Sequence, residues 1–155
     1  MTTTDPNFER WMGEALSLAE AAGQAGEVPV GAVIVVDGAV VAHGRNRREE
    51  RQSAAAHAEI DALEDFGRKF GTWRLPPNAQ LFVTVEPCNM CTGALLWARA
   101  THLYWGCDDP RAAGLRTQLP LIAAGVFDHR FQETQGGIAA DRCAETMRRF
   151  FKARR

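Results

Sequence analysis

The chain has 155 residues, 46% of them apolar and 24% charged, which is typical of a globular protein with one sizeable core. We therefore expect residues 1–155 to form a single domain. The net charge of −1 does not indicate a nucleic-acid partner by itself, and the sequence contains no apolar run that predicts a membrane span or a secretory signal.

Hydrophobic periodicity divides the chain into helical and strand-like stretches. In chain order, the expected elements are a helix over residues 6–22, strands over 28–36 and 39–42, a helix over 54–66, a strand over 81–85, a helix over 88–100, a strand over 102–106, a helix within 115–124, a short strand within 127–133 and a helix over 141–151. This order predicts an α/β fold, a three-layer α/β/α sandwich around a central mixed five-stranded sheet.

The first helix and the first strand carry the clearest local signals. Asp5 and Pro6 suit the cap and the first position of a helix, and Gly23 and Gly26 are expected to end it. The valine-rich run over residues 28–36 predicts a strand that is buried on both faces.

The stretch that follows this strand is mainly polar. Asp37-Gly38 favours a tight turn into the second strand. Residues 43–53 are rich in arginine and predict a loop, in which Asn46 is the one small polar residue without an obvious surface role. An isolated asparagine is most often a turn residue, so the sequence alone does not assign Asn46 a function.

The strongest chemical signal is the pair Cys88 and Cys91 at the head of a predicted helix. A lone Cys-x-x-Cys fits half a zinc site, a redox dithiol or coincidence. His57 and Glu59, in the first turn of an earlier predicted helix, add a third metal ligand and a carboxylate that is not needed as a ligand. A metal-binding pair among four cysteines fits a reducing cytoplasm better than a disulfide framework.

Two cysteines and one histidine leave a fourth tetrahedral position open, which is typical of catalytic rather than structural zinc. The pKa of a water molecule there would fall from about 16 toward about 7, and Glu59 could move its proton. A structural site would need a fourth protein ligand. None of the candidates has ligand-like spacing: His43, His102, His129, Cys107 and Cys143.

Two other features have ordinary structural explanations. Residues 141–155 contain six basic and two acidic side chains, a net charge of +4, while the rest of the chain sums to −5. A basic helix of this kind is most often a solvated face. The prominent aromatic residues are expected in the core or in subunit contacts: Trp97, Tyr104, Trp105 and Phe127.

The sequence resembles a known superfamily. His57-Ala58-Glu59 followed by Glu86-Pro87-Cys88-Asn89-Met90-Cys91 matches the established signature of the zinc-dependent cytidine deaminase-like enzymes. Within that superfamily, the chain is similar to the bacterial tRNA-specific adenosine deaminases along nearly its whole length. The matching stretches are residues 28–33, 46–47, 56–60, 73–75, 81–88, 90–94, 128–130 and 150–155.

The resemblance implies roles for individual residues. The zinc ligands would be His57, Cys88 and Cys91. The proton shuttle would be Glu59, and the base contacts would be Asn46, Val30 and the backbone around Ala58 and Glu86. Members of this family have the α/β/α sandwich fold, form homodimers and convert the wobble adenosine of a tRNA anticodon to inosine. The chain ends in a stretch that the family uses near RNA, so its candidate RNA contacts are Arg149, Lys152, Arg154 and Arg155.

Three segments depart from the family pattern. Ser53-Ala54-Ala55 stands in place of Asp-Pro-Thr, residues 112–117 replace a Gly/Ala-rich segment, and Asp128 stands where asparagine is usual. These changes spare the zinc chemistry and fall where substrate contacts or loops are expected. Two alternatives therefore remain: a deaminase of a free base or nucleoside (cytosine, guanine or adenine), and a zinc-stabilised binding module, which would give Glu59 no role.

Overall fold

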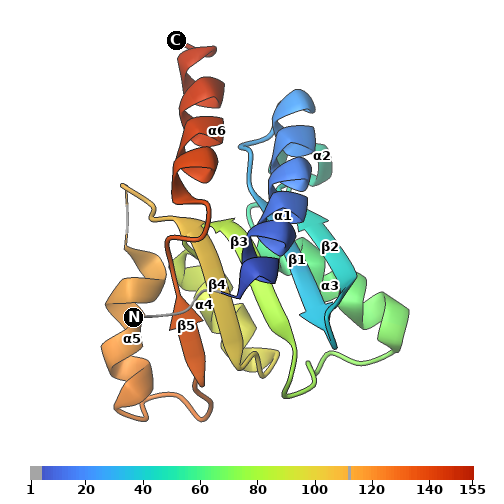
Figure 1. Ribbon diagram of the computed structural model, residues 1–155, viewed down its shortest axis with the longest axis vertical. Coiled ribbons are helices and arrows are strands. Elements are labelled where there is room, and N and C mark those ends of the chain that lie inside the picture. The colour runs from blue at the N-terminus through green and yellow to red at the C-terminus, as the bar shows by residue number, and fades with distance from the viewer. Residues whose placement is uncertain (1–4, 112) are drawn as a thin grey trace.

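The computed structural model describes residues 5–111 and 113–155 (Figure 1). Residues 1–4, in which no apolar leader was expected, and Ala112, from the departing segment 112–117, lie outside the described residues. In the part that is described, none of the helices combines the length and apolar character needed to cross a membrane.

A mixed five-stranded sheet lies at the centre of the molecule, with strand order β2-β1-β3-β4-β5 (Figure 1). Its strands are β1 (Gly31–Val36), β2 (Ala39–Arg45), β3 (Gln80–Val85), β4 (His102–Cys107) and β5 (Glu133–Gln135). β1 runs antiparallel to β2 and β3, whereas β3, β4 and β5 are parallel. The predicted α/β fold around a mixed five-stranded sheet is confirmed.

Helices cover both faces of the sheet. The helices are α1 (Pro6–Gln24), α2 (Arg48–Arg51), α3 (Ala58–Phe70), α4 (Asn89–Trp97), α5 (Gly114–Ala123) and α6 (Ala140–Lys152). One buried cluster joins α1 and α6 to the sheet, and a second cluster joins α3, α4 and α5 to the opposite face. The short α2 follows β2 and lies outside these layers.

The alternation of side chains along the strands explains the two clusters. Val33 and Phe82 point toward α1, whereas Ile34 and Val83 point toward α3. Tyr104 completes the α1 side and stacks on Phe82 with ring centroids 4.8 Å apart. Strands β1 and β3 are therefore buried on both faces, which the valine-rich run predicted for β1.

The predicted start of α1 is confirmed. The Asp5 carboxylate accepts a hydrogen bond from the Asn7 N–H at 2.9 Å, and Pro6 occupies the first helical position. The predicted end is wrong by two residues, because the helix continues through Gly23 to Gln24. The chain then turns at Gly26, which has a φ of +83°.

Two predicted boundaries in the hairpin region are wrong. β1 begins at Gly31, because Pro29 has no N–H to give to the sheet and the Val30 N–H bonds to the Val28 carbonyl at 2.9 Å instead. β2 extends to Arg45, and α2 forms within the remainder of the stretch predicted as a loop over residues 43–53.

The predicted boundaries of three elements beyond α2 are also wrong. α3 begins at Ala58 rather than at residue 54, because turns occupy residues 53–57, and it continues to Phe70, where Gly71 adopts the left-handed conformation. α4 ends at Trp97, before residue 100. β5 covers Glu133–Gln135, at the end of and beyond the strand predicted over residues 127–133. These three residues are the ones that pair in register with the first half of β4.

Two glycines let backbone segments approach closely beside the pocket described below. A Cβ on Gly44 in β2 would overlap the backbone of Ala58 and Ala62 in α3. A Cβ on Gly114 would lie 2.6 Å from the Pro87 carbonyl oxygen, where the first turn of α5 packs on the segment before α4. Both contacts fix the heads of helices that carry the candidate ligands.

Candidate metal centre and substrate pocket

The candidate ligands lie at the N-terminal ends of two helices on the same face of the sheet. His57 is the N-cap of α3, and Cys88 is the N-cap of α4. The Cys91 N–H points at the Cys88 sulfur from 3.5 Å. His57 was predicted in the first turn of a helix beginning at residue 54, and the later start of α3 places it at the cap instead. Cap positions leave both side chains free to face the gap between the helices.

The three side chains meet at distances that fit a bound zinc ion. The His57 Nδ1 atom lies 3.6 Å from the Cys88 sulfur and 3.5 Å from the Cys91 sulfur. Tetrahedral zinc, with bonds of about 2.3 Å to sulfur and about 2.0 Å to nitrogen, would hold such atoms about 3.5 Å apart. The three donor atoms lie within 4.8 Å of one another. The site therefore fits a divalent metal ion.

Proton positions in this cluster are strongly shifted. Hydrogen bonds from the Cys91 thiol and the His57 ring lower the pKa of Cys88 to about 4. The same contact with Cys88, together with burial, raises the pKa of Cys91 far above its ordinary value. The bond to Cys88 raises the pKa of His57. Because metal ligands must be deprotonated, binding of a divalent ion at these thiols would release the Cys91 proton.

Glu59 lies beside the ligands in the first turn of α3. Its side chain is buried, and its Oε2 atom accepts a hydrogen bond from the Cys91 thiol at 3.4 Å. Burial raises the pKa of Glu59 to about 7. Within the described residues, the close cluster of candidate ligand atoms comprises His57, Cys88 and Cys91, so Glu59 remains available for another task.

The predicted fourth-ligand candidates are not part of this cluster in the described residues: His43, His102, His129, Cys107 and Cys143. Cys143 is buried against the sheet, whereas Cys107 is only half-buried. His129 instead lies 2.8 Å from the Ala100 carbonyl oxygen through its Nε2 atom. The arrangement is three ligands rather than a closed set of four.

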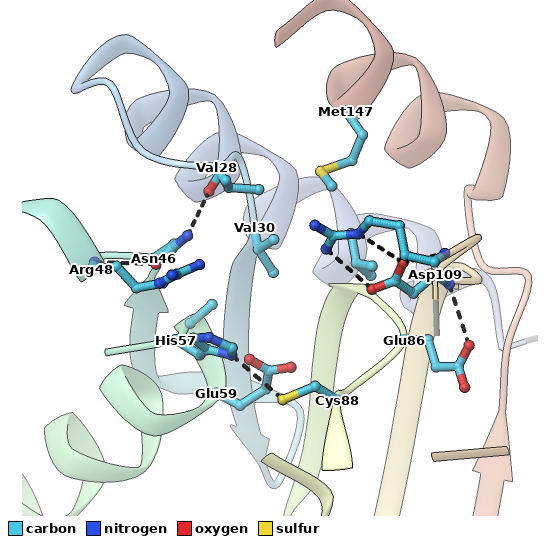
Figure 2. Close-up of a pocket in the computed structure, with 13 residues that line it drawn as sticks. Val28, Val30, Asn46, Arg48, His57, Glu59, Glu86, Cys88, Asp109 and Met147 are labelled. Atoms are coloured by element: carbon cyan, nitrogen blue, oxygen red, sulfur yellow. Dashed lines mark hydrogen bonds and ion pairs between the residues drawn. The ribbon is translucent and has the colours of Figure 1, made fainter. Parts of the chain in front are cut away.

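A pocket opens directly above the cluster (Figure 2). Its wall includes almost every residue predicted for the site: Val30, Asn46, His57, Ala58, Glu59, Glu86 and Cys88. Cys91 lies beneath this wall, fully buried. The structure thus brings together the candidate metal ligands, the buried carboxylate and the predicted base contacts around one cavity.

Asn46 is held in place by both ends of its amide group. Its Nδ2 atom donates to the Val28 carbonyl at 3.2 Å, and its Oδ1 atom accepts from the Arg48 N–H at 3.2 Å. The Asn46 N–H also bonds to the Val30 carbonyl. These contacts leave one N–H and one lone pair of the amide for a ligand.

Glu86 contributes its backbone to the pocket while its side chain points away from His57 (Figure 2). The buried carboxylate accepts hydrogen bonds from the Arg116 N–H at 3.1 Å, from Arg116 Nε at 2.9 Å and from the Asp109 N–H at 3.3 Å. Arg116 belongs to the segment that departs from the family pattern. It ties that segment to the wall of the pocket.

Several residues of the pocket wall were not predicted from the sequence: Val28, Arg48, Val85, Asp109, Arg111 and Met147. Asp109 and Arg111 follow β4, and the carboxyl ends of neighbouring parallel strands are a common place for binding residues. That rule could have identified them. Met147 comes from α6, more than 30 residues further along, and no motif marks it.

Two buried carboxylates hold the segment that carries Asn46 and Arg48. Glu27 accepts the N–H groups of Glu49 and Glu50, each at 2.9 Å. Asp61, in α3, accepts hydrogen bonds or ion pairs from three arginines at 2.9–3.0 Å: Arg45, Arg47 and Arg51. This wall of the pocket is therefore fixed from both sides.

The predicted RNA contacts point in two directions. Lys152 and Arg155 line a groove between α6 and the loop after β4, which we call the α6 groove; it shares Arg111 and Met147 with the pocket. Arg149 and Arg154 lie outside this groove: Arg149 is 4.0 Å from Glu20, and Arg154, just after α6, stacks on the Phe150 ring. The structure therefore brings only two of the four side chains into the groove beside the pocket.

Comparison with known proteins gives three kinds of match. A profile of the MafB19-like deaminases matches residues 6–155, a span that includes the whole pocket. The tRNA-specific adenosine deaminase of Streptococcus pyogenes serotype M1 is 40% identical over 142 residues, which are 92% of this chain and 82% of the relative.

Solved structures of related enzymes have the same fold. One, from a study of A-to-I editing by tRNA:A34 deaminases at the wobble position of transfer RNA, superposes with a TM-score of 0.81 and 37% identity, over 88% of this chain and 98% of the other. A guanine deaminase from Nitrosomonas europaea superposes with a TM-score of 0.71 and 25% identity, over 97% and 86% of the two chains.

Proposed function

The chain belongs to the MafB19-like deaminase family and is a hydrolytic deaminase, and on that premise we propose that it converts the wobble adenosine of a tRNA anticodon to inosine, with release of ammonia. The observation that carries the proposal is the 40% identity to a tRNA-specific adenosine deaminase over 92% of the chain. The position of the pocket beside the basic side chains of the α6 groove supports it.

We propose that His57, Cys88 and Cys91 hold one zinc ion per chain. The observed donor distances of 3.5 and 3.6 Å support this ligand set, as does its mixture of one imidazole and two thiols. Bound there, zinc would supply an acidified water molecule as the nucleophile for hydrolysis.

Glu59 is the proposed proton carrier. Its buried carboxylate lies at the cluster without belonging to the ligand set, so it can accept a proton from the attacking water and deliver it to the base. Hydrolytic deamination breaks the bond between the ring carbon and the amine and forms a carbonyl, and the amine must gain a proton to leave as ammonia. The Oε2 atom of Glu59 would pass on that proton as well.

The adenine ring is proposed to bind between Val30 and His57. Val30 presents an apolar side chain to the pocket, and the imidazole of His57 faces the same space (Figure 2). The remaining N–H and lone pair of Asn46 can bond to the base, while the backbone around Ala58 and Glu86 meets its polar edge. Apolar walls with a few fixed polar groups are typical of base-binding pockets.

We propose that the RNA strand leaves the pocket along the α6 groove. Lys152 and Arg155 line the groove and can bind phosphates there. The tail was predicted to contact RNA as a whole, and the structure favours these two side chains over Arg149 and Arg154, whose partners are Glu20 of α1 and the Phe150 ring.

A homodimer is proposed as the assembly. Trp73 and Trp97, which are 66% and 70% exposed, line a hollow between the end of α3 and α4. Large exposed apolar side chains of this kind mark association surfaces. Trp97→Arg should shift the mass measured by light scattering toward the monomer, whereas Val126→Arg, at a site that is 65% exposed, should not.

The cytoplasm is the proposed location of the protein. Its four cysteines form no disulfide with one another, which supports a reducing compartment.

The function is tested by measuring ammonia release from a panel of substrates. The panel contains an anticodon stem-loop with adenosine at the wobble position, the bases cytosine, guanine and adenine, and their nucleosides. We expect turnover of the stem-loop and little of the free compounds. The structural likeness to a guanine deaminase makes free guanine the second candidate, and preferential turnover of guanine would replace the tRNA proposal.

A further inference from the structure

One arginine beside the pocket differs from its neighbours. Four arginines lie within residues 45–51, from the end of β2 through α2, and ion pairs hold three of them: Arg45 with Glu50, Arg47 with Glu50 and Asp61, and Arg51 with Asp61 and Glu64. No ion pair of Arg48 is found among residues 5–111 and 113–155. Its side chain is exposed and lines the pocket.

The backbone of Arg48 is fixed, although no ion pair holds its guanidinium within the described residues. The Arg48 N–H bonds to Asn46 Oδ1 at 3.2 Å, and Glu27 binds the next two N–H groups. From this anchored backbone the side chain extends toward the pocket on the Asn46 side, close to His57 (Figure 2). A free guanidinium on a fixed backbone is prepared to bind an anion at low cost in entropy.

The arginine on the opposite wall of the pocket, Arg111, is paired with a carboxylate. Arg111 also lines the pocket, but both of its contacts go to the Asp109 carboxylate, at 3.3 Å each. A neutral purine needs no cation at the entrance of its pocket, and Arg48 therefore has no role if the substrate is a free base. The anionic groups of a nucleotide in RNA are its backbone phosphates, which remain outside when the base enters a pocket.

We propose that Arg48 binds a backbone phosphate next to the adenosine whose base occupies the pocket, and so selects RNA over free bases and nucleosides. This inference rests on the proposed function and adds a specificity-determining residue to it. Arg48 and the α6 groove lie on opposite sides of the pocket, so the strand would be held on both sides of the reacting nucleotide.

The test compares Arg48→Gln with the native protein on two kinds of stem-loop. One stem-loop has a normal backbone, and the others carry a single uncharged methylphosphonate linkage on the 5′ or 3′ side of the target adenosine. Arg68→Gln, in the last turn of α3 about 15 Å along the helix from Ala58, removes the same charge as a control. Inosine formation, bound zinc and melting temperature are measured for each protein.

We expect Arg48→Gln to raise KM for the normal stem-loop about tenfold, with kcat, zinc content and melting temperature unchanged. One of the two methylphosphonate linkages should raise KM of the native protein to the same extent. The same linkage should not raise KM of Arg48→Gln any further. The slope of log(kcat/KM) against log salt should fall by about one unit, and Arg48→Lys should restore most of the loss.

Three results would overturn the inference while leaving the proposed function intact. The first is a KM of Arg48→Gln equal to that of the native protein. The second is that Arg48→Gln and each methylphosphonate raise KM independently, so that their effects multiply. The third is that Arg48→Gln lowers the zinc content and leaves KM unchanged. If the native protein forms no inosine from the stem-loop, the proposed function itself is wrong and the inference falls with it.

Discussion

The inner and outer parts of the pocket are built in different ways. The inner part consists of His57, Glu59, Cys88 and Cys91, which lie at two helix heads and are fixed by buried backbone contacts. The outer part consists of Arg48, Asp109, Arg111, Met147 and the α6 groove, which come from segments far apart in the chain and include exposed side chains. The residues proposed for the reaction chemistry are therefore concentrated in two short motifs, whereas those proposed for substrate choice are spread over the fold.

The largest expected effect comes from the inner part. Glu59→Gln keeps the shape of the side chain but removes its ability to carry a proton, so kcat should fall by about 10²–10⁴ while zinc content stays at one per chain. Glu64→Gln changes an exposed carboxylate of the same helix and serves as the control. A Glu59→Gln enzyme with native turnover would remove Glu59 from the mechanism, and loss of zinc would make it a ligand.

A smaller effect is expected from the packing behind the inner part. In Gly44→Ala, the new methyl group would overlap the backbone of Ala58 and Ala62, so we expect the free energy of unfolding to fall by about 1–3 kcal/mol. Displacement of the α3 head should also weaken zinc binding. Urea unfolding and metal titration measure the two effects.

Gly67 provides a matched control in the same helix. A Cβ there would meet the Thr72 carbonyl oxygen at 3.5 Å, an ordinary contact, and alanine is a better helix former than glycine. Gly67→Ala should therefore be neutral or should stabilise the protein by up to about 1 kcal/mol. Equal destabilisation by both substitutions would show that the close approach of β2 to α3 is not what fixes the ligand.

The smallest expected effect comes from the outer part. Replacing Lys152 and Arg155 together by glutamine should raise KM for a tRNA stem-loop several-fold, because the α6 groove loses two cations. Replacing Arg149 and Arg154 together removes the same charge from positions outside the groove and should change KM much less. Equal effects of the two pairs, measured at several salt concentrations, would contradict the assignment of the groove to RNA.

The inner part was readable from the sequence because its signals are local. Cys88 and Cys91 share one helical turn, His57 and Glu59 share another, and these spacings survive errors of a few residues in the helix boundaries. The resemblance drawn from this signature is confirmed by the family match over residues 6–155. It also pointed to Asn46, which composition alone left as a turn residue and which the structure places in the pocket wall.

The outer part was not readable because its residues meet only through tertiary packing. Met147 reaches the pocket because α6 packs beside the carboxyl end of β4, and nothing near it in the sequence indicates this. Arg48 resembles its three arginine neighbours in sequence, and only the ion pairs of those neighbours distinguish it. Such differences depend on which acid each arginine meets, and spacing along the chain does not determine that.

The central claim is that one imidazole and two thiolates hold a zinc ion with a position left open. X-ray absorption at the zinc edge, recorded on the purified protein, tests it most directly. We expect one zinc per chain, with two sulfur neighbours at about 2.3 Å, one histidine nitrogen at about 2.0 Å and one further light atom. A protein without a transition metal, or a zinc ion bound by four protein side chains, would contradict the account.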